Sequence, residues 1–272
     1  MTQLYGVIGD PIAHSLSPLI HKGWMRDHRL PADYLGLQVP ADAFDESILT
    51  LSKKGFKGLN VTMPHKLNAL KWAKIVTPQA RKIGAVNTLW RDLDGDWHGD
   101  NTDAPGFMAS LGEIFNQPLE GTDVLVLGAG GSARAIIYAL DEAGARVRLA
   151  NRTLSKAEAI LSLFEESSHT ALSLEEGLAA AGDFRLVVNT TSLGYSGQGL
   201  KLPDSHGGLL YDISYGKAAK TILEPAAAQG WRAADGLSML VYQAAYAFER
   251  WFDIMPDIEK GLQRCRRVLE VA

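Results

Sequence analysis

Residues 128–133, Gly-Ala-Gly-Gly-Ser-Ala, have the spacing of a turn that binds phosphate through its backbone. They follow the apolar run Val124–Leu127 and precede a segment typical of a helix. Glycine permits a tight turn and close approach to an anion, and the N–H groups that open the helix face the negative charge. Ala133 replaces the usual third glycine and is small enough for close helix–strand packing. The pattern predicts a dinucleotide site, but flavin and nicotinamide binders share it.

The end of the next predicted strand, Arg146–Ala150, carries no acid. Asn151, Arg152 and Thr153 stand there, and Asn151 is 23 positions after Gly128. Enzymes that bind NAD place a carboxylate at this point to hydrogen-bond the ribose diol. A guanidinium instead suits the 2′-phosphate of NADP, which it can bind with two hydrogen bonds. These residues therefore predict NADP as the cofactor.

Two common dehydrogenase designs are excluded by the sequence. No tyrosine is followed four positions later by lysine, so the catalytic pair of the short-chain enzymes is missing. Cys265 is the single cysteine, and the seven histidines do not show the spacing of zinc ligands. We expect no catalytic metal, and hydride transfer must be assisted by polar groups in the first half of the chain.

Four polar clusters stand in that half. Residues 14–18, His-Ser-Leu-Ser-Pro, present two hydroxyls at a predicted helix start, which suits a carboxylate. Residues 60–66 end an apolar strand, at the edge where open α/β sheets bind ligands. Residues 84–88 and 99–103 add amides, hydroxyls and acids. Caps and turns favour the same residue types, so each cluster alone also fits a structural role. Together they suit a small polyhydroxylated acid.

Strands alternating with helices are predicted to position these clusters, which favours largely parallel sheets. The predicted strands are Leu4–Ile8, Tyr34–Val39, Gly58–Thr62, Ala85–Arg91, Val124–Leu127, Arg146–Ala150, Leu186–Asn189, Leu209–Asp212 and Trp231–Ala234. Ser17 is predicted to cap the helix that starts at Pro18, Asp94-Gly95 predicts a hairpin, and a helix is predicted over Leu154–Glu166. Helices predicted at Leu237–Phe252 and Asp257–Leu269 have no strand to follow, so we expect them to pack on the first half.

The composition is that of a folded globular protein. Hydrophobic residues make up 46% and charged residues 21% of 272 residues, which excludes intrinsic disorder. A net charge of −4 argues against nucleic acid or an anionic membrane as a partner. No apolar run reaches the ~18 residues of a membrane span, and the N-terminus has no signal-peptide pattern. We expect a cytoplasmic protein.

Eight motifs, in register over nearly the whole chain, resemble those of the shikimate dehydrogenase family. They are residues 15–18 (SLSP), 60–66 (NVTMPHK), 84–88 (GAVNT), 101–103 (NTD), 128–131 (GAGG), 151–153 (NRT), 189–194 (NTTSLG) and 236–244 (GLSMLVYQA). The resemblance implies reversible NADPH-dependent reduction of 3-dehydroshikimate to shikimate, a step toward chorismate and the aromatic amino acids.

The resemblance also implies the site residues. Lys66 and Asp103 would form the catalytic pair. The substrate would be bound by Ser15, Ser17, Asn60, Thr62, Asn87, Tyr215 and Gln243. NADP would be bound by Gly128, Ala129, Gly130, Gly131, Ser132, Asn151, Arg152, Thr153, Thr190, Gly236 and Met239.

The implied fold is two α/β domains with the active site in the cleft between them. Residues 1–102 and 238–272 would form the substrate-binding and catalytic domain, and residues 103–237 a Rossmann-type NADP-binding domain. We expect a monomer or homodimer. Two alternatives stay open: a quinate/shikimate dehydrogenase, and a non-catalytic NADP-binding sensor on the same scaffold. Intact Lys66 and Asp103 argue against the sensor.

Overall fold

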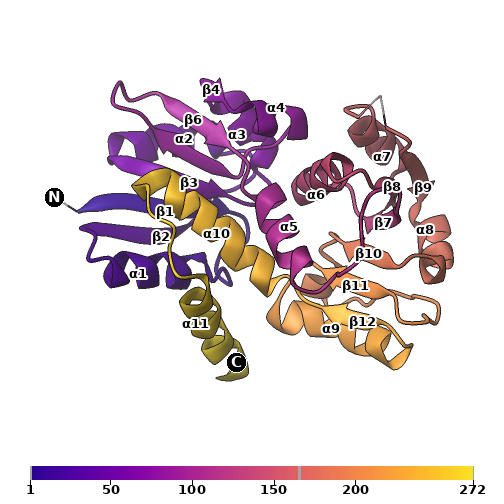
Figure 1. Ribbon diagram of the computed structural model, residues 1–272. Coiled ribbons are helices and arrows are strands. Elements are labelled where there is room, and N and C mark those ends of the chain that lie inside the picture. The colour runs from indigo at the N-terminus through magenta and orange to yellow at the C-terminus, as the bar shows by residue number, and fades with distance from the viewer. Residues whose placement is uncertain (1, 165–166, 272) are drawn as a thin grey trace. The chain divides into compact units, whose positions relative to one another are not determined.

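Two α/β units, each with its own six-stranded sheet, make up the chain (Figure 1). The computed structural model describes residues 2–164 and 167–271. Unit 1 takes the chain up to Gly106 and again from Leu240, and unit 2 is Phe107–Met239. The expected mixed α/β fold with two sheets is confirmed.

Unit 1 contains a mixed sheet of strand order β2-β1-β3-β5-β6-β4. Its strands are β1 (Gln3–Gly9), β2 (Ala32–Gln38), β3 (Phe56–Val61), β4 (Ile75–Val76), β5 (Thr88–Arg91) and β6 (Trp97–Asp100). Its helices are α1 (Ser17–Asp27), α2 (Phe44–Lys53), α3 (Lys66–Trp72) and α4 (Pro78–Ile83), together with the start of α5 (Asp103–Gly112). Strands β1, β2 and β3 are parallel, whereas β5 is antiparallel to β3 and β6. The predicted hairpin is confirmed: Gly95, at φ +88°, lies in the turn between β5 and β6.

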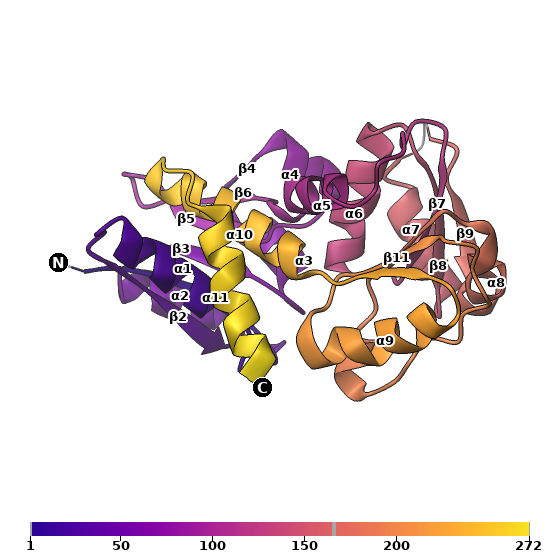
Figure 2. The same cartoon turned by 60° about the horizontal axis from the view of Figure 1, so that its bottom comes forward.

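The last two helices, α10 (Leu237–Phe252) and α11 (Ile258–Val271), pack on unit 1 as expected (Figure 2). The indole of Trp24 in α1 donates a 2.9 Å hydrogen bond to the carbonyl of Asp257, just before α11. Gly261 lies so close to Trp24 that an added Cβ would come within 2.8 Å of the indole ring. Residues far apart in sequence therefore share one core.

Unit 2 contains a wholly parallel sheet of order β12-β11-β10-β7-β8-β9. Its strands are β7 (Asp123–Leu127), β8 (Arg146–Asn151), β9 (Thr170–Ser173), β10 (Leu186–Asn189), β11 (Leu209–Asp212) and β12 (Arg232–Ala234). Its helices are α6 (Gly131–Glu142), α7 (Leu154–Leu161), α8 (Leu174–Ala180), α9 (Gly216–Ala228) and the short 3₁₀ turns Ala181–Asp183 and Leu193–Ser196. This is the Rossmann strand order, and the direction of winding reverses between β7 and β10.

Two local predictions were wrong. Helix α7 ends at Leu161, because the backbone N–H groups beyond the cap position bond three residues back and not four, Leu163 donating to Ile160 and Phe164 to Leu161. Glu165 and Glu166, at the end of the predicted helix, lie outside the described residues. Helix α1 begins one residue early, with Leu16 rather than Ser17 at the cap position.

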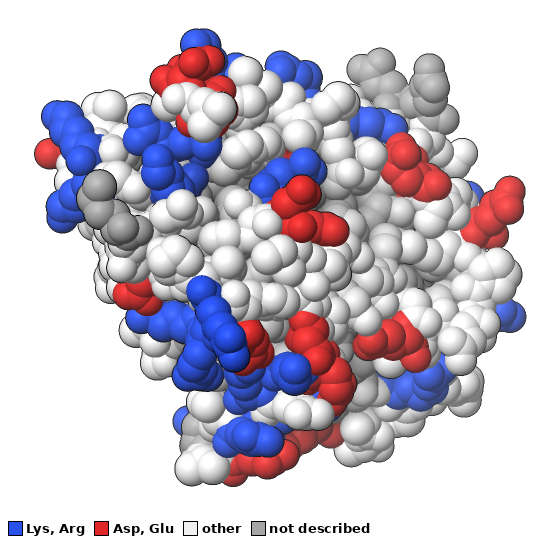
Figure 3. All heavy atoms as spheres, turned by 60° about the vertical axis from the view of Figure 1, so that its left-hand side comes forward, with Lys and Arg blue, Asp and Glu red and all other residues white. Residues whose placement is uncertain are grey.

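Acidic and basic side chains both occur on the face in Figure 3, where they lie beside one another mainly in the lower part, and a broad area between the charged groups is uncharged. Within the described part of the chain, no helix combines the length and apolarity needed to cross a bilayer.

Candidate active site

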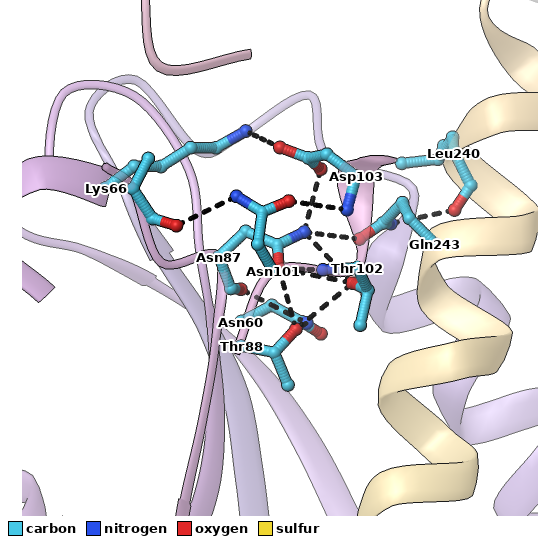
Figure 4. Close-up of polar contacts among 10 residues, drawn as sticks. Asn60, Lys66, Asn87, Thr88, Asn101, Thr102, Asp103, Leu240 and Gln243 are labelled. Carbon is cyan, nitrogen blue, oxygen red and sulfur yellow. Dashed lines mark hydrogen bonds and ion pairs between the residues drawn. The ribbon is translucent and has the colours of Figure 1, made fainter. Parts of the chain in front are cut away.

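Lys66 and Asp103 form a buried ion pair in unit 1 (Figure 4). The Lys66 Nζ lies 2.5 Å from Oδ2 of Asp103, and the two side chains are only 9% and 7% exposed. Each residue opens a helix, Lys66 opening α3 and Asp103 opening α5. The helix dipole at the start of α5 favours a negative charge on Asp103. The pair therefore places an ammonium and a carboxylate in direct contact, at a position largely shielded from solvent.

The turn before Lys66 is fixed by the buried His65. Its ring Nε2 lies 2.7 Å from the carbonyl of Val39, and its backbone N–H donates to the carbonyl of Thr62. The carbonyl of Lys66 in turn accepts a 3.0 Å hydrogen bond from Val86, next to β5. Lys66 is therefore held by backbone contacts on both sides.

Asn87 stands at the centre of the polar network around the pair. Its Nδ2 donates to Oδ1 of Asp103 at 2.7 Å and to Oγ1 of Thr102 at 3.0 Å. Its Oδ1 accepts from the backbone of Thr102 and from the hydroxyl of Thr88. The Asp103 backbone N–H donates to Oδ1 of Asn101, which fixes the loop before α5. With Lys66 on Oδ2, these bonds hold both oxygens of the Asp103 carboxylate.

Gln243 enters this network from α10. Its Oε1 lies 3.4 Å from Nδ2 of Asn87, and its Nε2 donates to the carbonyl of Leu240. Gly106 allows this approach, since an added Cβ would come within 2.8 Å of the backbone of Gln243. The expected grouping of Lys66, Asp103, Asn87 and Gln243 thus lies within one unit.

Asn60 and Thr62 lie at the carboxyl end of β3, beside the same network. The Asn60 side chain is buried, and its Nδ2 lies 3.3 Å from the hydroxyl of Thr88. Thr62 donates its backbone N–H to the carbonyl of Ile8, and a Cβ on Gly9 would collide with its methyl group. Both residues are placed where the sheet ends.

Ser15 and Ser17 lie at the start of α1. The Ser15 hydroxyl accepts a 3.3 Å hydrogen bond from the backbone N–H of Ser17, the first residue of the helix, whereas Leu16 at the cap position makes no side-chain cap bond. Ser17 is 5% exposed, whereas Ser15 is half-buried. Pro18 occupies the second position of the helix, where its missing N–H costs no hydrogen bond.

In unit 2, the turn at residues 128–131 fits a pyrophosphate. Gly128 has φ +101°, and a Cβ there would lie 2.7 Å from the hydroxyl of Thr190. A Cβ on Gly130 would meet nothing within 4 Å, so this side of the turn is open. Gly130 stands at the cap position of α6 and has no side chain to cap it, so the N–H groups that open the helix suit an anion such as the pyrophosphate of NADP.

Arg152 lies at the same sheet edge, because Leu127 and Ala150 are paired neighbours in β7 and β8. The side-chain amide of Asn151 donates to the carbonyl of Thr153, which closes the turn around Arg152. Arg152 is exposed and lines a cavity of about 720 Å³. The other residues of the lining are Ser173, Leu174, Glu175, Leu178, Ala179, Lys201, Leu202 and Pro203. Two cations and apolar walls suit a phosphorylated adenosine, with Glu175 as the one acid.

Thr190 directly follows β10 and hydrogen-bonds the end of β7 through both its backbone N–H and its hydroxyl. Asn189, held by the buried Asp212 at 2.7 Å, accepts from the backbone N–H of Thr191. Burial raises the pKa of Asp212 above its usual value. The remaining predicted residues of unit 2 are Tyr215, at the cap position of α9, Gly236, packed against the carbonyl of Ile213, and the buried Met239.

Comparisons with known proteins agree with this geometry. The "Shikimate dehydrogenase substrate binding domain" model matches residues 7–89, "Shikimate / quinate 5-dehydrogenase" matches 110–194 and "Shikimate 5'-dehydrogenase C-terminal domain" matches 236–266. The "Shikimate dehydrogenase (NADP(+))" of Hyphomonas neptunium is 50% identical over 270 residues, covering 99% of both chains. The chain belongs to the shikimate dehydrogenase family.

Solved structures of shikimate dehydrogenases have the same fold as this chain. The shikimate 5-dehydrogenase of Thermus thermophilus, solved in complex with NADP(H) and shikimate, has a TM-score of 0.84 at 36% identity, covering 98% of this chain and 99% of that one. A shikimate dehydrogenase from Aquifex aeolicus also has a TM-score of 0.84, at 34% identity over 97% and 98% of the chains. As in that family, an N-terminal substrate domain accompanies a Rossmann-like NADP-binding domain.

Several residues of this polar network had no predicted role. Asn101 and Thr102 stood inside a recognised motif, so their position gave a signal. Thr88 did as well. Tyr34, whose hydroxyl donates to Asn60, is the one buried residue of β2, and its sequence context gave no signal.

Proposed function

We propose that the chain is an NADP-dependent shikimate dehydrogenase that interconverts 3-dehydroshikimate and shikimate. The observation that carries the proposal is the buried Lys66–Asp103 pair, joined to the amides of Asn87 and Gln243. A pair of this kind provides a proton donor among groups that recognise hydroxyls. Family membership supplies the substrate.

The substrate is proposed to bind in unit 1 through groups of matching chemistry. The hydroxyls of Ser15 and Ser17 bind its carboxylate at the start of α1. The ring hydroxyls bind to amides and hydroxyls, which are those of Asn60, Thr62, Asn87, Tyr215 and Gln243. Hydroxyl and amide groups discriminate well because a missing partner leaves a buried polar atom unpaired.

Lys66 is the proposed proton donor. NADPH, when bound, supplies a hydride to the carbonyl carbon of 3-dehydroshikimate. The Lys66 ammonium stabilises the negative charge that develops on the carbonyl oxygen and gives that oxygen its proton. Asp103 orients the ammonium through their 2.5 Å contact and is available to a neighbouring substrate hydroxyl. In the reverse direction, Lys66 takes the proton from the hydroxyl.

The NADP-binding residues are proposed in unit 2. Backbone N–H groups of residues 128–132 hold the pyrophosphate, and Arg152, flanked by Asn151 and Thr153, holds the 2′-phosphate. Thr190, Gly236 and Met239 contact the nicotinamide half. The domain division at residues 102 and 238, a cytoplasmic location, and a monomer or homodimer complete the proposal.

Initial rates of NADP reduction, followed at the nicotinamide absorbance with shikimate and then with quinate, test this function. We expect turnover with shikimate and little with quinate. Lys66→Ala protein, purified in parallel, controls for dehydrogenase from the expression host. Comparable rates with both substrates would indicate a quinate/shikimate dehydrogenase. NADPH binding without turnover of either would indicate the sensor.

A further inference from the structure

Tyr34 lies against Asn60, one of the proposed substrate-binding residues. It is part of β2 and is fully buried. Its hydroxyl donates a 2.7 Å hydrogen bond to Oδ1 of Asn60 on β3. Strand β1 separates β2 from β3 in the sheet, so the phenol reaches across a whole strand to make this contact.

The phenol of Tyr34 stays in its neutral form, in which it can donate a proton. Burial raises the pKa of Tyr34 well above its usual value. The phenol therefore keeps its proton at working pH, and the 2.7 Å contact is a hydrogen bond donated by Tyr34 to Asn60.

The partners of the Asn60 amide fix its orientation. With Oδ1 accepting from Tyr34, the NH₂ group faces the hydroxyl of Thr88 at 3.3 Å and the carbonyl of Asn87 at 3.5 Å. An amide rotated by half a turn would bring Oδ1 toward the carbonyl of Asn87, and two acceptors would then face each other. Tyr34 adds its hydrogen bond to the one orientation of Asn60 that the Asn87 carbonyl permits.

The phenol ring itself is held in place. The His21 imidazole stacks on it with ring centroids 4.3 Å apart and an angle of 8° between the planes. His21 is completely buried, and the Trp251 ring of α10 packs nearby, with its centroid 6.1 Å from that of Tyr34. These contacts leave the hydroxyl little freedom to reach other partners.

We propose that Tyr34 is a positioning residue for substrate recognition, whose hydroxyl holds the Asn60 amide in the orientation that binds a substrate hydroxyl. This inference rests on the proposed function, in which Asn60 binds a hydroxyl of shikimate. Tyr34 need not touch the substrate for this role. Its effect falls on substrate affinity and not on the binding of NADP.

Tyr34→Phe removes only the hydroxyl, and Tyr5→Phe is a matched control. Tyr5 pairs with Tyr34 in the β1–β2 register, is 4% exposed, and donates its own hydroxyl to Gln3. We expect Tyr34→Phe to raise both KM and the calorimetric Kd for shikimate roughly 5- to 30-fold, the range for a lost buried hydrogen bond. The Kd for NADPH should stay within about two-fold, and Tyr5→Phe should change none of these constants beyond that.

A double-mutant cycle with Asn60→Ala tests whether Tyr34 acts through Asn60. If it does, Tyr34→Phe adds little to the loss of shikimate affinity once Asn60 is gone. Full additivity, equal losses of shikimate and NADPH affinity, or an unchanged Kd in Tyr34→Phe would each overturn the inference. The proposed function is judged separately on the unmodified enzyme, since failure to oxidise shikimate there would contradict it whatever Tyr34 does.

Discussion

Asn87 donates a 2.7 Å hydrogen bond to Oδ1 of Asp103, whose other oxygen, Oδ2, lies 2.5 Å from Nζ of Lys66. The carboxylate is therefore held from two sides, by the side-chain amide of Asn87, just before β5, and by the ammonium of Lys66, the first residue of α3. A carboxylate fixed in this way keeps the ammonium in a constant position, which is what proton transfer to a positioned substrate requires.

Lys66→Ala should lower kcat roughly 10²- to 10⁴-fold, because the positioned proton donor is removed. The Kd for NADPH should change much less, since the cofactor motifs lie in unit 2. Lys71→Ala is the matched control, because Lys71 is an exposed lysine on the same helix. Steady-state rates and NADPH fluorescence titration measure both effects. A kcat within a few-fold of the unmodified enzyme would mean that Lys66 is not the donor.

Replacing Ser15 and Ser17 together with Ala should raise KM for shikimate far more than KM for NADP. Carboxylate binding is present in the ground state and the transition state alike, so the loss appears mainly in KM. Initial rates with each substrate varied in turn provide the comparison. If KM rises equally for both, the two serines act as structural caps of α1.

Arg152→Ala should raise KM for NADP roughly 10- to 100-fold and leave KM for NAD nearly unchanged, because only NADP carries the 2′-phosphate. Arg148→Ala is the control, since Arg148 lies on β8, just before Arg152, and is already paired with Asp123 at 3.0 Å. Fluorescence titration with NADPH and NADH gives a readout independent of turnover. Parallel losses with both cofactors would rule out a specific contact with the phosphate.

His21 should make the protein less stable in acid. Burial lowers its pKa from 6.5 to about 3, and the facing Asn60 side chain opposes this only in part. Below pH 6.5 the unfolded chain binds a proton that the native imidazole excludes, so the free energy of unfolding falls as the pH falls toward 3. The slope from one such group is about 1.4 kcal/mol per pH unit. Above pH 6.5 this contribution is constant.

Urea unfolding of the unmodified protein and His21→Phe, at several pH values between about 8 and 5, tests this. The phenyl ring retains the stacking surface against Tyr34. The variant should lose less stability on acidification below pH 6.5, while the two proteins keep a constant difference above it. Identical slopes over the whole range would show that His21 does not titrate in this way.

The Rossmann half was predictable because each of its signals is local. The continuous apolar run Val124–Leu127 predicts a buried parallel strand, and this strand is buried. The glycines that follow predict a tight turn, and Gly128 has the positive φ, +101°, that such a turn requires. Elements with weaker local signals were missed. Strand β4 has two residues, and α9 contains Pro225, which usually ends a helix. Helix α8 did carry a signal, the capping box formed by Ser173 and Glu176.

The members of the site were predictable from motifs, but their connections were not. The sequence places Asn87 and Asp103 in neighbouring clusters, whereas their hydrogen bond depends on how β5, β6 and the loop before α5 are paired. Tyr34 shows the limit most clearly. A buried tyrosine on a strand is common in any core, and only the three-dimensional neighbours reveal where its hydroxyl points.

Direct detection of hydride transfer tests the central claim. 3-Dehydroshikimate is incubated with the enzyme and NADPH deuterated at the transferred position of the nicotinamide ring, and the product is examined by NMR and mass spectrometry. The account predicts shikimate with one deuterium on the new carbinol carbon, and an initial rate of labelled product roughly 10²- to 10⁴-fold lower with Lys66→Ala. Absence of labelled shikimate with the unmodified enzyme, although NADPH binds, would contradict it.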